Sequence, residues 1–94
     1  MSLIVHIPRF EVGQVVIAPG AASKVSSDEV FLGLVCHMSE DWGELDEFDW
    51  KQNDDAVEYG GRILSRYVTQ DGAIFWIITE CDRTLTTILL PAEY

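Results

Sequence analysis

Residues able to bind metals or act as nucleophiles are few in this chain of 94 residues, and they are widely spaced. The histidines are His6 and His37, and the cysteines are Cys36 and Cys81. Neither cysteine belongs to a Cys-x-x-Cys pair, and these positions match none of the usual zinc spacings. The acidic run 40–49 lacks the alternating order of acids that a calcium loop requires. The sequence therefore predicts no metal site and no cofactor, and we expect both thiols to be free.

Nucleophilic catalysis requires a nucleophile, a general base and a group that orients the base. Ser65 with His6 or His37 supplies the first two residue types, but no Gly-x-Ser-x-Gly turn surrounds Ser65. The turn Glu80–Arg83 (sequence ECDR) gathers a thiol and charged groups at the end of a predicted strand. An arginine ion pair that tightens a hairpin is one interpretation of this turn, and a substrate or partner contact is the other. We expect a non-enzymatic protein, with a small enzyme or toxin-type component acting near Glu80–Arg83 as the alternative.

The acidic residues are more informative, because they are concentrated in one segment. The formal net charge is −10, and the window Asp28–Glu58 contains eleven acids and one base, Lys51. The five acids and five bases outside this window cancel, so the window carries the whole net charge. This distribution disfavours direct binding of DNA or RNA and favours a partner with a basic surface.

Two interpretations of the acidic segment stay open. It can be a solvated face that keeps a small protein soluble, or it can act as a DNA mimic that imitates phosphate charge. Carboxylates at i, i+3 and i+4 of a helix recur at a spacing comparable to that of phosphates. A cationic groove attracts such rows over a Debye length of about 8–10 Å. The rows predicted here are Asp46, Asp49 and Asn53, followed by Asp54, Asp55 and Glu58.

Tryptophans accompany these acids and suggest apolar anchors for a partner. Trp42 lies in an acidic turn, where it can either fill the core between two helices or serve as an exposed anchor. Trp50 is the second candidate anchor. The predicted partner-binding residues are Glu40, Asp41, Trp42, Glu44, Asp46, Glu47, Asp49, Trp50, Asp54, Asp55 and Glu58.

The strands that must support these residues are predicted mainly at the C-terminus. Between Arg62 and Leu90, three strand-like runs are separated by an Asp-Gly hairpin turn and by the turn at 80–83. The middle run, 73–79, is continuously apolar at its centre, as expected of a central strand. Gly13–Ile17 predicts a further strand, and Pro19-Gly20 predicts the turn that ends it. Leu3–Ile7 is expected to be a short strand or a docked arm.

Two helices are predicted between these strands. Ser26-x-x-Glu29 has the form of a capping box and precedes an apolar stripe of helical period that ends at Met38. His37 borders this stripe, and we expect it to be exposed. The second helix spans Asp46–Tyr59 and stops at two glycines. Its few apolar residues, among them Phe48, Trp50, Ala56, Val57 and Tyr59, indicate a helix that lies on the surface.

These elements predict one domain over residues 1–94 with an α+β fold. A mainly antiparallel sheet, made of the C-terminal three-strand meander and one or two N-terminal strands, would be covered by two helices. The chain contains no apolar stretch of about 18 residues, and its N-terminus lacks the basic lead-in of a signal peptide. We therefore expect a cytoplasmic protein that does not span a membrane.

Three motifs resemble a widespread family of small bacterial proteins that are labelled hypothetical or plasmid-related. The motifs are SEDWGELDEFDWKQND, GGRILSRY and WIITECDRTLTTILLPAEY, and the resemblance covers about Gly13–Tyr94. In this chain Ala18–Ala21 replaces the family's TPGA element and Asp41–Gly43 matches its DWG turn, while Cys81 replaces the usual alanine. The resemblance implies a role on plasmids and other mobile elements, and hence in conflict between such elements and their hosts.

The leading hypothesis joins this resemblance to the acidic segment. It is a non-enzymatic inhibitor, of the anti-CRISPR or anti-restriction type, which occupies the basic nucleic-acid-binding surface of a defence complex. A third hypothesis is an oligomeric structural module with an unpaired sheet edge. The oligomeric state itself stays open at this point.

Overall fold

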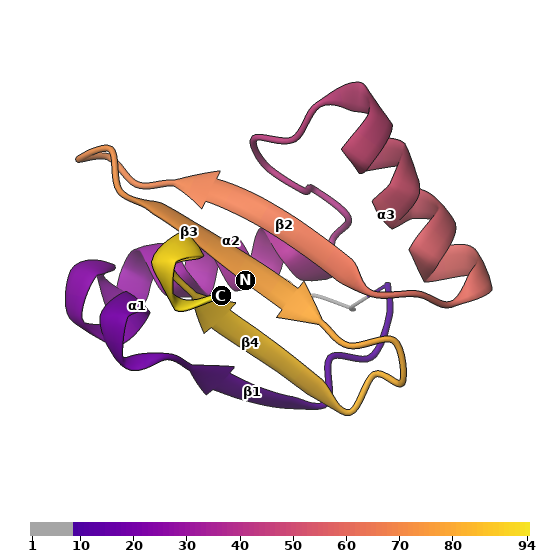
Figure 1. Cartoon of the computed structure of the whole chain (residues 1–94), viewed down its shortest axis with the longest axis horizontal. Coiled ribbons are helices and arrows are strands. Elements are labelled where there is room, and N and C mark those ends of the chain that lie inside the picture. The colour runs from indigo at the N-terminus through magenta and orange to yellow at the C-terminus, as the bar shows by residue number, and fades with distance from the viewer. Residues whose placement is uncertain (1–8) are drawn as a thin grey trace, which may run out of the picture.

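The computed structural model describes residues 9–94, so the predicted N-terminal strand or arm and His6 lie outside the described residues. Helices and strands alternate irregularly along the chain, with the sheet formed mainly by its last third (Figure 1). In order, the elements are β1 (Gln14–Ile17), α1 (Pro19–Lys24), α2 (Ser27–Met38), α3 (Glu47–Tyr59), β2 (Ile63–Val68), β3 (Ile74–Thr79), β4 (Leu85–Leu89) and the 3-10 helix η1 (Pro91–Glu93).

The four strands form one sheet in the order β1-β4-β3-β2. The C-terminal strands make the predicted antiparallel meander, with β3 between β2 and β4. β1 adds to the far side of β4 in parallel, since Gln14 lies beside Leu85 and Ile17 beside Ile88. The α+β class with a mainly antiparallel sheet is confirmed, and β1–β4 is the one parallel pair of strands among residues 9–94.

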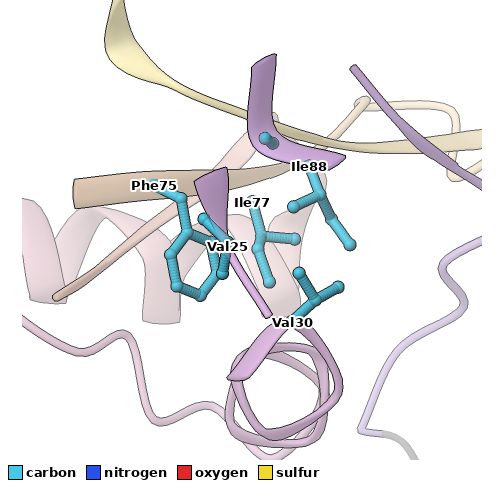
Figure 2. Packing of buried hydrophobic residues seen from close by; sticks show 6 residues of the cluster. Val25, Val30, Phe75, Ile77 and Ile88 are labelled. Carbon is cyan, nitrogen blue, oxygen red and sulfur yellow. The ribbon is translucent and has the colours of Figure 1, made fainter. Parts of the chain in front are cut away.

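α2 crosses one face of the sheet and closes the main hydrophobic core. Figure 2 shows Val30 of α2 facing Phe75 and Ile77 of β3 and Ile88 of β4, with Val25 beside them. The helix begins where predicted, because the Ser26 side chain accepts a hydrogen bond from the Glu29 backbone N–H at 3.2 Å. Burial of these large aliphatic and aromatic side chains, at about 1.5–3 kcal/mol each, is the main force holding α2 on the sheet.

The predicted turn at Pro19-Gly20 is instead the start of helix α1, which corrects that expectation. Proline suits the first turn of a helix, because its missing N–H would have no partner there. The cap comes from the other end of the chain: the Glu93 carboxylate accepts hydrogen bonds from the N–H groups of Gly20 (2.7 Å) and Ala21 (3.0 Å). A cap supplied by a residue more than seventy positions away leaves no local trace in the sequence.

α3 packs against the outer edge of β2, at the upper right of Figure 1. Here Trp42, Ala56 and Ile63 form a second buried cluster, with Val57 packed against it. The helix spans the predicted residues, with Asp46 as its N-cap and Gly60, at φ 87°, ending it. It is thereby held firmly to the sheet while most of its surface faces away from the protein.

Candidate functional site

The outward surface of α3 and its preceding loop carries a group of exposed carboxylates, which we call the acidic surface. Asp46 positions the helix, because its side chain accepts a hydrogen bond from the Asp49 N–H at 2.8 Å. Acids near this end of the helix also complement the partial positive charge of its N-terminus. The acidic surface consists of Glu44, Asp46, Glu47, Asp49, Asp54, Asp55 and Glu58, all of them exposed.

Few cations neutralise the acidic surface. Among residues 9–94, its one ion pair joins Lys51 to Asp55, at 3.1 Å between Nζ and Oδ2. An exposed pair of this i,i+4 kind contributes only about 0.3–0.5 kcal/mol. Glu40, in the loop before the acidic surface, lies 4.0 Å from Arg9. The negative charge of the acidic surface is therefore largely unpaired, and its carboxylates face solvent.

The three nearby arginines are engaged elsewhere. Arg62 pairs with Glu80 at 3.5 Å, and Arg66 donates to the backbone oxygen of Glu44 at 3.4 Å. Arg83 donates to the backbone oxygens of Gly61 and Ala56, next to the C-terminal end of α3. Each guanidinium therefore fixes local structure and is not paired with a carboxylate of the acidic surface.

Two aromatic side chains stand out from α3 among these acids. Phe48 is 70% exposed and Tyr59 is 78% exposed. With Gln52 and Asp55 they occupy positions i, i+4, i+7 and i+11, which share one face of a helix. This is the arrangement by which a helix presents apolar anchors to a partner. The sequence places both aromatic residues among the few apolar residues of this helix, and their spacing does not show which of these residues face outward.

Trp42 fills the core, so its role as a partner anchor is corrected. The side chain is fully buried against Ala56 and Ile63, and its Nε1 donates to Asp54 Oδ1 at 2.9 Å. It lies edge-on to His37, with 5.6 Å between ring centroids. Of the two tryptophans proposed as anchors, only the half-buried Trp50 reaches the surface.

Asn53 is also buried, which interrupts the predicted row of Asp46, Asp49 and Asn53. Its amide pairs with the backbone of Leu64 in β2 and is turned away from solvent. Asp54, Asp55 and Glu58 are exposed. Glu47, Asp54 and Glu58 follow each other at i, i+7 and i+11 and share one flank of α3, whereas Asp49 and Asp55 lie on other flanks.

A serine and a histidine do meet inside the protein, although the geometry excludes catalysis in this conformation. His37 Nδ1 lies 2.6 Å from Ser65 Oγ, as in a nucleophile–base pair. Both residues are fully buried, so no substrate reaches the hydroxyl. The expectation that His37 is exposed is wrong, because α2 turns this polar residue toward the sheet.

The hydrogen bonds around His37 form a chain with one direction, which fixes its tautomer. Thr86 Oγ1 donates to the Val12 backbone oxygen at 2.7 Å, so it must accept the 2.7 Å hydrogen bond shared with Thr79 Oγ1. Thr79 donates that proton and so accepts from His37 Nε2 at 2.8 Å. His37 Nδ1 then accepts from Ser65. The ring is neutral: burial, reinforced by the positive charge of Arg83, lowers the pKa of His37 to about 3.

The turn Glu80–Arg83 has the features of a structural hairpin. Arg83 adopts φ 62° and contributes its guanidinium to the backbone contacts described above. Asp82 accepts hydrogen bonds from the N–H and hydroxyl of Thr84 at 3.1 and 2.7 Å. Glu80 is paired with Arg62, across from Arg83. The charged groups of this turn thus contact the protein itself.

Within residues 9–94, no three His, Cys, Asp or Glu side chains are grouped so that they could share a metal ion. No helix in this part of the chain combines the length and the apolar character needed to cross a bilayer. Comparisons of the chain with protein-family models, with curated proteins and with solved structures gave no match.

Proposed function

We propose that this chain is a non-enzymatic interaction protein whose α3 binds a cationic surface on another macromolecule. The observation that carries the proposal is the acidic surface, whose seven exposed carboxylates form a single ion pair, Lys51–Asp55, within the part of the chain that the structure describes. Such a field attracts a basic partner over about 8–10 Å at physiological salt.

Phe48 and Tyr59 give this surface an apolar component. Charge alone provides attraction and register, whereas burial of aromatic side chains contributes most of the energy at protein interfaces. The two rings stand on one face of α3 with Asp55 between them. A partner groove with basic rims and apolar pockets would be complementary to this face.

In its sharper form, the proposal is that the partner is a nucleic-acid-binding complex of host defence, which the chain inhibits by occupying its groove. The net charge of −10 and the resemblance of the C-terminal motif to plasmid-related proteins favour this version. The spread of carboxylates over several flanks of α3 suits a groove that surrounds the helix on more than one side.

The test is displacement of labelled duplex DNA from purified bacterial CRISPR effector and restriction complexes. The chain should compete with the duplex, and its affinity should fall steeply as salt increases. The doubly reversed variant Glu47→Lys/Glu58→Lys should weaken competition at least about tenfold, since charged contacts of this kind contribute more than about 1 kcal/mol.

A matched control places the same change in charge elsewhere. Glu11→Lys/Asp28→Lys alters two exposed acids that lie outside α3, and it should leave competition close to that of the unmodified chain. Equal losses in both double variants would mean that net charge alone matters. Absence of competition at low salt would overturn the inhibitor proposal.

A further inference from the structure

The two edges of the sheet differ in whether their backbone groups are hydrogen-bonded, and this difference points to a second interaction surface. At the β2 edge, the backbone of Arg66 pairs with Trp42 O (3.1 Å) and Glu44 N (2.7 Å). The backbone of Leu64 pairs with the Asn53 side chain. This edge is therefore covered by the chain itself.

The edge formed by β1 is open in the part of the chain that the structure describes. Gln14 N–H donates to Thr84 O at 3.0 Å and Ala18 N–H to Ile88 O at 2.8 Å, so alternate residues of β1 face β4. Strand alternation then directs the N–H and C=O groups of Val15 and Ile17 away from the sheet. An edge of this kind is a template for pairing with another strand.

An apolar groove runs beside this open edge, between β1, α1 and α2. Its volume is about 400 Å³, and Ile88 lies among its lining residues. Val15 and Ile17 are 38% and 46% exposed along one side, and Phe31 of α2 is 64% exposed along the other. Backbone groups and apolar side chains on one surface are what an added β-strand requires.

We propose that the occupant is the β1 strand of a second copy of this chain, giving a symmetric dimer. Two identical strands that pair in antiparallel fashion are related by a twofold axis, so the same edge satisfies both copies. With Val16 on the axis, Val15 lies opposite Ile17 of the partner subunit. Both residues then exchange N–H···O=C bonds, and their side chains cover the two grooves.

The distribution of charge favours a second copy at this edge. Seven of the exposed acids lie on the acidic surface around α3, whereas Lys24 is the one charged residue between Gly13 and Ser27. The acids nearest the groove in sequence are Asp28 and Glu29, in the first turn of α2. The sheet order places β1 and α3 at opposite edges (Figure 1). Two strongly acidic molecules therefore meet along the sides where they repel each other least, and both acidic surfaces remain free.

Sedimentation equilibrium over a range of concentrations tests the dimer. The expected result is a reversible species of twice the monomer mass of 10.6 kDa. Phe31→Asp should shift the dissociation constant at least about tenfold, because burying that aromatic contributes more than about 1.4 kcal/mol. Leu32→Asp alters the neighbouring side chain of α2, which is 61% exposed but does not line this groove, and it should leave the dissociation constant unchanged.

Cysteine cross-linking tests the register. In a Cys36→Ser/Cys81→Ser background, Val16→Cys should form a disulfide-linked dimer under mild oxidation, because the two positions meet on the axis. Gln14→Cys lies on the same side of β1 but away from the axis, and it should not cross-link. Val15→Pro removes one outward N–H of β1 and should weaken the dimer. It provides a second test if Phe31→Asp unfolds the chain.

The outcomes separate this inference from the proposed function. A chain that stays monomeric at its highest soluble concentration overturns the dimer, and so does a dimer insensitive to both Phe31→Asp and Val15→Pro. Photo-cross-linking from position 31 into residues 1–8 of the same chain would identify an internal occupant and would also overturn it. None of these results affects competition with DNA by α3.

Discussion

Asn53 replaces a strand at the edge of the sheet by pairing with Leu64. Its Nδ2 donates to the Leu64 backbone oxygen at 2.6 Å, and its Oδ1 accepts from the Leu64 N–H at 3.1 Å. One amide side chain therefore supplies both partners that a neighbouring strand would supply. The same contact anchors the middle of α3 to β2 and keeps its exposed face in a fixed orientation.

Asn53→Ala should reduce the free energy of unfolding by about 2–4 kcal/mol, because it leaves two backbone groups without partners. Urea denaturation of the variant measures this loss. The neighbouring Gln52→Ala, on the exposed side of α3, should change the free energy by less than about 0.5 kcal/mol. Similar values for both variants would show that the edge is satisfied in another way.

Stability should decline in acid because His37 stays neutral in the folded protein. An unfolded histidine with a pKa near 6.5 takes up a proton before the folded one, whose pKa is about 3. His37 thus contributes its full stability above pH 6.5, and this contribution is lost as pH falls toward 3. The slope approaches about 1.4 kcal/mol per pH unit between these values.

Urea denaturation at several pH values, with His37→Gln for comparison, measures this slope. The variant should lose this part of the pH dependence even if it is less stable overall. His6→Gln, which removes the other histidine, should retain the slope. An unchanged slope in His37→Gln would assign the acid sensitivity to carboxylates.

Gly43→Ala should be among the most damaging single substitutions in the chain. Gly43 adopts φ 76°, and a Cβ there would lie 2.1 Å from the backbone oxygen of Arg66. Because that oxygen belongs to β2 and cannot move aside, the expected loss is about 3 kcal/mol or more. Thermal or urea unfolding measures it.

Gly72→Ala is the matched control for Gly43→Ala. Gly72, in the Asp-Gly hairpin turn, has a similar φ of 89°, but its Cβ would meet no atom within 4 Å. This variant incurs only the conformational cost, about 1 kcal/mol. Equal losses in the two variants would contradict a steric role for the contact between Gly43 and Arg66.

Replacing Glu93 should loosen α1. Its carboxylate accepts from the N–H groups of Gly20, Ala21 and Leu90, and these hydrogen bonds lower its pKa. The stabilisation is present above the carboxyl's ordinary pKa and is lost as pH falls through the lowered value. Glu93→Gln should therefore lower the melting temperature at pH 7. At pH 3 the melting temperatures of the variant and the unmodified chain should differ by less. Glu11→Gln should do neither.

The parts of the fold that depend on local sequence could be predicted. The β2–β3–β4 meander follows from hydrophobic runs and turn residues, and α2 and α3 begin at the caps provided by Ser26 and Asp46. Contacts between distant residues could not be predicted. The α1 cap by Glu93 and the edge contact of Asn53 both join segments that have no local relationship.

The direction in which aromatic and polar side chains point on a helix was the least predictable feature of the site. The sequence was compatible with exposed positions for His37 and Trp42. Both are buried, and their polar atoms form hydrogen bonds with Thr79 and Asp54. Phe48 and Tyr59 face outward, because Asn53 and Ala56 occupy the inward face of α3. The direction of these side chains depends on how α3 packs against β2, and it cannot be read from the composition of the helix.

The hydrogen bonds from Ser65 through His37 to Val12 all run in one direction, and they couple the opening of the elements that they join. Their donors and acceptors belong to α2, each strand of the meander and the segment before β1, and reversing one hydrogen bond would leave one acceptor among them without a donor. These elements should therefore separate together rather than one at a time. In native-state deuterium exchange, the amides of α2 and the central strands should share one opening free energy, well above that of the exposed last turn of α3.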